Sequence, residues 1–159
     1  MKKITSALCF LTLSILLLTP SRSYARQLPE KEYIGKDLYC VTSIEEYSSY
    51  TNQKYNIKTT VNTKTASKTV TYENSKGDIL WYVKVTGTFS YNGTSSSCIL
   101  ASVTAEAYSD NWKISDKTSK KSGNTAIASA TGKLYSLSHV IQTLTRTVSL
   151  TCSKSGILS

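Results

Sequence analysis

Residues 81–91 show the clearest pattern in the chain, a strict alternation of apolar and polar positions. One face, interrupted by Gly87, holds Trp81, Val83, Val85, Phe89 and Tyr91. The positions between them hold Tyr82, Lys84, Thr86, Thr88 and Ser90. This period of two predicts a half-buried β-strand. Gly87 leaves a gap in the apolar face, which indicates a bulge, a bend or an aromatic ring from across the sheet lying over it.

Other segments alternate in the same way. The longer ones are 98–108, 125–131 and 139–152, and the shorter ones are 55–61, 68–73 and 112–114. Polar turn signals separate them, and Asn92-Gly93 is the strongest because this dipeptide is typical of hairpin turns. About six to seven short strands with turns between them predict an all-β fold, an antiparallel β-sandwich over residues 54–159.

Residues 26–53 are less regular. Leu38, Val41, Ile44 and Tyr47 match a helical period for a few turns, whereas Val41, Thr42 and the tyrosines equally suit a strand. We therefore expect an N-terminal arm that is either irregular or a short helix, placed between residues 1–25 and the sandwich.

Residues 1–25 have the anatomy of a secretory signal peptide. Lys2 and Lys3 precede the apolar run Ile4–Leu18, and Ser23-Tyr24-Ala25 places small residues around a cleavage site before Arg26. The run is shorter than the roughly 20 residues that a membrane span needs. A retained N-terminal anchor is the alternative. We expect a secreted protein, extracellular or loosely associated with the cell wall, with no transmembrane segment in its mature form.

The expected mature chain is basic. It contains 16 Lys and Arg against 10 Asp and Glu, a net charge of +6. This balance favours anionic partners such as wall polymers, acidic glycans or lipid head groups, although it also serves solubility alone. The lysines are scattered, and no basic run is interleaved with aromatic residues, so nucleic acid is not an expected partner.

Three cysteines remain once Cys9 leaves with the signal peptide. Cys98 and Cys152 both stand at ends of predicted strands in the C-terminal region, so we predict a disulfide between them, with Cys40 free or paired between chains. The alternative is that no bridge forms. The cysteines lack CxxC spacing and histidine partners, so we expect no metal site.

Residues for catalysis are sparse. His139 is the sole histidine, no GxSxG elbow is present, and the acidic residues fall mostly in predicted loops or the arm. Asp78, Asp110 and Asp116 lack the clustered spacing of a calcium loop. We therefore expect no catalytic residues, no cofactor and no enzymatic activity.

Binding is better supported by the composition. The expected mature chain has ten tyrosines but one phenylalanine, and tyrosine combines an aromatic face with a polar tip that suits sugar stacking and wet interfaces. Tyr82 and Tyr108 fall opposite the aliphatic faces of their strands, so they are the predicted binding surface. Trp112 could also stack on a ligand, whereas Trp81 shares a face with valines and is predicted to be core.

An ordered series of residues supports a resemblance. The series comprises residues 81–94, then Cys98, Trp112, residues 122–124 and residues 150–153. Over residues 69–159 the chain resembles an uncharacterised family of small secreted β-rich proteins from gut-associated Gram-positive bacteria. The resemblance implies secretion and a β-rich domain, and it also favours pairing of Cys98 with Cys152.

The function expected from these observations is that of a secreted or cell-surface, non-enzymatic β-domain that binds an anionic wall polymer, a glycan or a surface partner. The alternative is a secreted factor acting on other cells, bacteriocin-like or membrane-active, for which Ile34–Tyr50 is the candidate segment. A small hydrolase ranks last.

Overall fold

The computed structural model describes residues 29–52 and 61–159, and the side chains of these residues except 48–52. Its eight strands are β1 (Glu30–Gly35), β2 (Leu38–Asn52), β3 (Val61–Glu73), β4 (Ile79–Tyr91), β5 (Ser96–Ala107), β6 (Trp112–Ser122), β7 (Thr125–Ser136) and β8 (His139–Thr151). The described residues contain no helix, and hence none with the length and apolar character of a membrane span.

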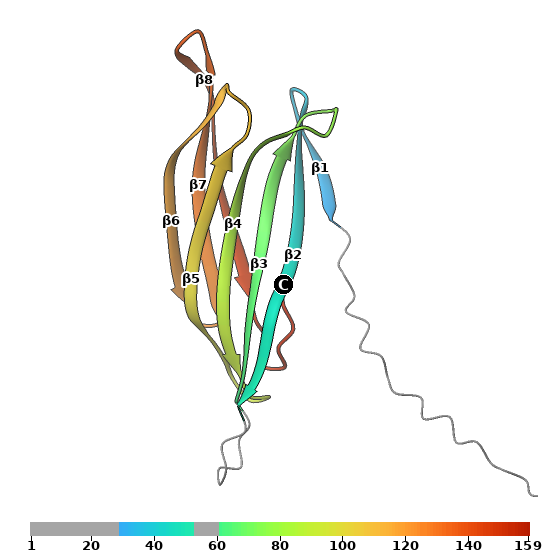
Figure 1. The fold of residues 1–159 in the computed structure, drawn as a ribbon, viewed down its shortest axis with the longest axis vertical. Helices are drawn as coiled ribbons and strands as arrows, with labels where there is room; N and C mark the ends of the chain where they lie inside the picture. Colours follow the sequence, from blue (N-terminus) through green and yellow to red (C-terminus); the bar gives the residue numbers. More distant parts are fainter. Residues whose placement is uncertain (1–28, 53–60) are drawn as a thin grey trace, which may run out of the picture.

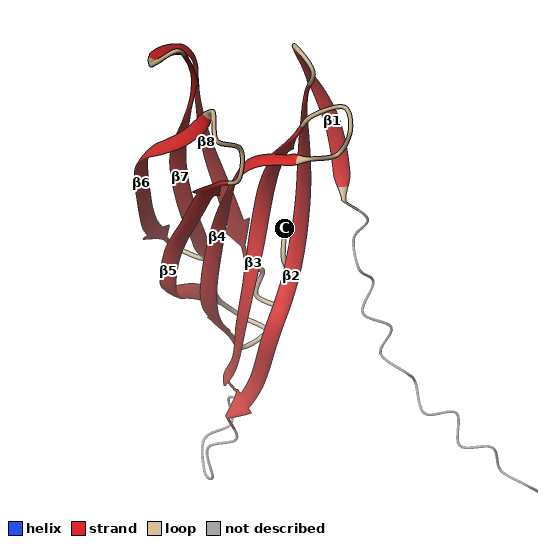
Figure 2. Ribbon diagram, turned by 45° about the horizontal axis from the view of Figure 1, so that its top comes forward, coloured by secondary structure: helices blue, strands red, loops and turns tan. Residues whose placement is uncertain are grey.

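The strands form two antiparallel sheets, in the order β1-β2-β3-β4-β5 and β6-β7-β8 (Figures 1 and 2). Within each sheet every strand pairs with its neighbour in sequence, so each sheet is a meander, and the chain passes from one layer to the other between β5 and β6. The predicted all-β antiparallel sandwich is confirmed, with eight strands rather than six or seven. The predicted signal peptide, residues 1–25, and most of the expected strand 55–61 lie outside the described residues.

The expectation of an irregular or partly helical arm at 26–53 is wrong for the residues that the structure describes. These residues form β1 and β2, which belong to the five-stranded sheet. Leu38 and Cys40 are buried, and Ile44 packs against the core, so the true period is two. The helical spacing of Leu38, Val41 and Ile44 was coincidental, because pairing of β2 with β3 decided the conformation.

The core lies between β4 of one sheet and β7 and β8 of the other. Trp81, Val83, Val85 and Phe89 of β4 are fully buried, as the alternation predicted. Small residues on β7 make room for these large ones: Ala126, Ala128 and Ala130 are buried, and a Cβ on Gly132 would lie 2.7 Å from the Trp81 ring. Large side chains from one layer therefore interdigitate with small ones from the other.

The space left by the missing side chain of Gly87 is filled by Phe89, two residues along the same strand. A Cβ there would lie 2.5 Å from Cζ of Phe89, whose ring folds back over the glycine. A register shift against β5 follows at Thr88 and Phe89. The aromatic ring over a glycine from the opposite sheet occurs instead at Gly132, which Trp81 covers.

An aromatic stack anchors the upper end of the sandwich, as oriented in Figure 1. The ring of Trp81 stacks on Tyr72 at 4.4 Å between centroids and on Trp112 at 5.9 Å. All three side chains are buried, so Trp112 is a core residue and not a ligand stacker. Burial, the main cause, raises the pKa of Tyr72 to about 12.

The lower end is tied together by the C-terminal residues. Gly93 N–H donates to the carbonyl of Lys154 at 2.9 Å, and Leu158 pairs with Cys152 beside the end of β8. Nζ of Lys64 donates to the carbonyl of Gly156 at 2.9 Å and forms an ion pair with Glu46, also at 2.9 Å. The chain end is therefore fastened to β3 and to the β4–β5 turn.

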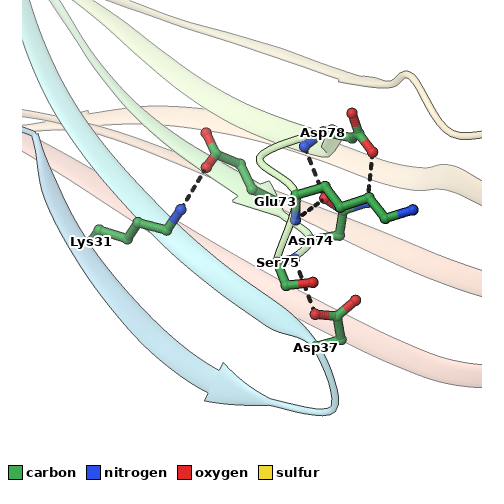
Figure 3. A network of polar contacts seen from close by, with 7 residues as sticks. Lys31, Asp37, Glu73, Asn74, Ser75 and Asp78 are labelled. Atoms are coloured by element: carbon green, nitrogen blue, oxygen red, sulfur yellow. Dashed lines mark hydrogen bonds and ion pairs between the residues drawn. The ribbon is translucent and has the colours of Figure 1, made fainter.

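Polar contacts organise the turns near the upper end of the larger sheet (Figure 3). Oδ1 of Asn74 accepts from the backbone N–H groups of Lys76 and Asp78, both at 2.9 Å, which shapes the β3–β4 turn. Oδ1 of Asp37 accepts from Ser75 N–H at 3.0 Å and joins this turn to the β1–β2 turn. These carboxyl and amide groups therefore have structural roles.

Candidate functional site

The structure brings the two predicted surface tyrosines together. Tyr82 and Tyr108 stack at 5.9 Å between ring centroids, with 22° between the ring planes. Tyr82 lies directly opposite Glu106 of β5, and Tyr108 follows two residues later, directly after the end of β5 at Ala107. A backbone bond from Tyr108 N–H to the carbonyl of Leu80 holds the second ring in place. We call Tyr82, Tyr108 and Glu106 the tyrosine patch.

The tyrosine patch is accessible and polar at its edges. Tyr108 is 62% exposed and Glu106 is exposed, whereas Tyr82 is partly buried. Partial burial and then the negative charge of Glu106 raise the pKa of Tyr82. Its hydroxyl, protonated at neutral pH like that of any tyrosine, can donate a hydrogen bond. An aromatic face beside a carboxylate acceptor and a hydroxyl donor is suited to a sugar ring and its hydroxyl groups.

The register places further hydrogen-bonding groups next to the tyrosine patch. Thr71 of β3 is opposite Tyr82, and Lys84 and Thr104 are opposite each other one step along β4 and β5. All three side chains are partly exposed. This outer face of the larger sheet is therefore largely polar, and it carries two aromatic pairs: Tyr82 with Tyr108 and, on the β1–β2 hairpin, Tyr33 with Tyr39 at 5.1 Å between centroids.

A second feature is the concentration of cations on β6. This strand carries four exposed lysines and a single acid, Asp116; the lysines are Lys113, Lys117, Lys120 and Lys121. The ion pairs between described side chains are Lys31–Glu73 and Lys64–Glu46, so the β6 lysines have no acidic partner among these residues. The apolar pattern of the sequence predicted only a short strand at 112–114, because residues 115–122 have no apolar period.

The predicted disulfide between Cys98 and Cys152 is not seen, because both residues and Cys40 have free thiols. Cys98 and Cys152 do lie against the same β6–β7 turn: their N–H groups donate to the carbonyls of Gly123 at 2.8 Å and Asn124 at 3.1 Å. Their thiols point to different carbonyls, those of Leu100 and Ser153. Burial raises the pKa of all three thiols, which makes them poor nucleophiles.

His139 begins β8 and is exposed, and its Nδ1 lies 3.1 Å from the carbonyl of Leu137. Among residues 29–52 and 61–159, no three His, Cys, Asp or Glu side chains converge as metal ligands would. The weak calcium candidates do not meet either: Asp78 bonds Asn74 and Asp116 bonds Ser115.

Arg146 is a residue whose environment the sequence left open. It projects inward from β8 opposite Ala130, and its Nε is buried without a hydrogen-bond partner. Its positive charge acts on Cys40 and Tyr72 of the larger sheet and opposes the rise in their pKa. Arg146 therefore projects into the sandwich, and it forms no ion pair with an acid among the described residues.

Comparisons with protein-family models, with curated proteins and with solved structures find no match to this chain, so the site must be interpreted from its own geometry.

Proposed function

We propose that this chain is a secreted or cell-surface, non-enzymatic binding domain, and that the tyrosine patch holds a glycan or an anionic wall polymer. The observation that carries the proposal is the stacked, exposed pair of Tyr82 and Tyr108 beside Glu106. Aromatic neighbours also stabilise a sheet, but this pair lies beside a carboxylate, and together they offer the aromatic face and polar groups that a sugar ring uses.

The lysines of β6 support an anionic ligand or an anionic setting. Exposed cations without acidic partners attract polyanions over a distance of about 8–10 Å at moderate salt. The β6 strand lies beside β5, since Nζ of Lys121 donates to the carbonyl of Ile99 at 2.9 Å. Long-range attraction would therefore act close to β5, the strand that carries Glu106 and leads into Tyr108.

Purified Gram-positive cell walls, used before and after removal of their phosphodiester polymers, test the proposal. The protein should bind, and Tyr108→Ala should weaken binding by about tenfold, equivalent to about 1.4 kcal/mol. Tyr33→Ala is a matched control, because Tyr33 is 61% exposed and belongs to a second tyrosine pair, with Tyr39, away from Glu106 on the β1–β2 hairpin. The double variant Tyr82→Ala with Tyr108→Ala should bind least.

The same binding assay separates the two ligand classes. Loss of binding after polymer removal, together with release by salt, would identify the polymer; retained binding would identify the glycan. If the folded Tyr108→Ala variant bound as tightly as wild type and Tyr33→Ala, the tyrosine patch would not be the site.

A further inference from the structure

The tip of the β7–β8 hairpin exposes a compact apolar cluster. Leu137 is 93% exposed, Ile141 61% and Val140 47%, so three of five consecutive residues present apolar side chains to solvent. Single exposed apolar residues are ordinary, but a cluster at a projecting tip is a feature that needs a reason. We call Leu137, Val140 and Ile141 the hairpin tip.

The backbone at the hairpin tip is also unfavourable. Leu137 has a φ of 46° and Ser138 a φ of 74°, so both residues of this two-residue turn are left-handed. Such turns favour Asn-Gly, and a bulky residue there costs about 1–2 kcal/mol. Leu137 therefore combines backbone strain with nearly complete exposure, and its side chain gains almost no contact within the chain. Features of this kind are often retained for function.

The hairpin extends past its neighbours. The first residue of β6, Trp112, pairs with Leu134, and the carbonyl of Asn111 before it accepts from Tyr135 N–H at 2.8 Å. Beyond that point, Ser136 and the start of β8 have no partner from β6 beside them. Figure 1 shows this hairpin projecting at the upper end of the smaller sheet. From Leu134, the last residue paired with β6, to Ser136 at the end of β7 the strand advances about 7 Å, given a rise of about 3.3 Å per residue.

Two lysines, Lys113 and Lys133, and the ring of Tyr135 lie next to the hairpin tip, on the side of the sandwich. Lys113 and Lys133 are opposite each other, and Nζ of Lys113 lies 5.3 Å from the centre of the Tyr135 ring. Neither lysine belongs to an ion pair in the described part of the chain. An apolar apex followed by an aromatic residue and then by lysines is the order in which side chains cross the surface of an anionic membrane.

We propose that the hairpin tip inserts into the outer apolar region of an anionic lipid bilayer, with Lys113 and Lys133 at the head groups. Interfacial elements bury apolar groups to a depth of about 5–10 Å, which matches the reach of this hairpin. A protein partner would need about 800 Å² on each side, more than a convex apex of three side chains offers. A bilayer needs no matching groove.

Co-sedimentation with vesicles tests this inference. Vesicles of phosphatidylcholine mixed with phosphatidylglycerol should bind the protein, and phosphatidylcholine alone should bind it at least several-fold less. Leu137→Asn with Ile141→Thr should lower binding about tenfold or more. Ile157→Thr is the matched control, since Ile157 is 68% exposed at the opposite end of the molecule. All variants carry the same N-terminus, so any contribution from Ile4–Leu18 is common to them.

A second measurement reports insertion directly. In Leu137→Trp, bromine-labelled acyl chains should quench the new indole, while the buried Trp81 and Trp112 should be little affected. Lys113→Gln with Lys133→Gln should weaken binding to the anionic vesicles and lessen its salt dependence. Equal vesicle binding by wild type and the Leu137→Asn, Ile141→Thr variant would overturn the proposal. So would sedimentation showing that these substitutions abolish a dimer instead, because a second copy would then cover the tip.

Discussion

The turns at the two ends of strand β7 differ in backbone conformation, exposure and hydrogen bonding. At the lower end, the Gly123-Asn124 turn is polar and is bonded on both sides by the N–H groups of Cys98 and Cys152. At the upper end, the turn of Leu137 and Ser138 is strained, and Leu137 is nearly fully exposed. The turn before β7 therefore stabilises the fold, whereas the turn after β7 contributes little to stability.

The contrast extends to the neighbouring segments. At the lower end, the C-terminal residues contact Lys64, Tyr91 and Gly93, so β3, the β4–β5 turn and the chain end stabilise one another. The upper end has a buried anchor, the stack of Tyr72, Trp81 and Trp112, but the β7–β8 hairpin projects beyond it. We infer that stability resides in the core and the lower end, and that the hairpin tip is free to serve binding.

The largest expected effect is at the lower end. Gly156 has a φ of 84°, and a Cβ there would lie 2.5 Å from the ring of Tyr91. Gly156→Ala should lower the free energy of unfolding by about 2–4 kcal/mol, the sum of backbone strain and overpacking. Gly93→Ala is the control, since Gly93 has a φ of 86° but no atom within 4 Å of such a Cβ.

Urea unfolding measures both glycine variants. Gly93→Ala should cost about 1–2 kcal/mol, from backbone strain alone. Equal losses in the two variants would show that the Tyr91 contact does not hold the C-terminal residues, and the contrast between the ends would weaken.

The next effect is of opposite sign and is at the upper end. Replacing Leu137 by Asn and Ser138 by Gly should raise the free energy of unfolding by about 1–2 kcal/mol, because these residues adopt the left-handed turn more easily. Thermal unfolding should show a higher Tm. A higher Tm together with loss of vesicle binding would show that the native residues of the tip lower stability but are needed for membrane binding. An unchanged or lower Tm would show that the backbone of Leu137 and Ser138 is not strained.

The smallest effect at neutral pH concerns the buried anchor. Burial raises the pKa of Tyr72 to about 12, above the value near 10 expected in the unfolded chain. The folded state therefore retains this proton longer, so the stability it contributes is present below pH 10 and is lost as pH rises from about 10 to about 12. The Tyr72 hydroxyl makes no hydrogen bond to another described residue, so Tyr72→Phe should change stability by under about 1 kcal/mol at pH 7.

Unfolding measured between pH 9 and pH 12 checks the Tyr72 prediction. The Tyr72→Phe protein should lose less stability than wild type over this range. Parallel loss in both proteins would mean that other groups govern alkaline unfolding and that the hydroxyl of Tyr72 has little part in it.

Local patterns predicted the strands in which one face is buried. The alternation of β4 places Trp81 in the core and Tyr82 outside, and both placements are confirmed. Periodicity did not predict β2, because its apolar residues fit two periods. It predicted only the start of β6, because the residues after Ile114 are all exposed. In both strands the conformation comes from backbone pairing with a neighbour, which leaves no clear mark in the sequence.

The sequence by itself determined the all-β class, the inward face of β4 and the outward placement of Tyr82 and Tyr108, because side-chain direction follows from a period of two. Only the tertiary structure decided that these tyrosines stack, that Trp81 covers Gly132 and that the Cys98 and Cys152 thiols point to different carbonyls. It also revealed the projecting hairpin tip. These features depend on strand register and sheet packing, which join residues that are distant along the chain, whereas periodicity reports only the burial of each segment by itself.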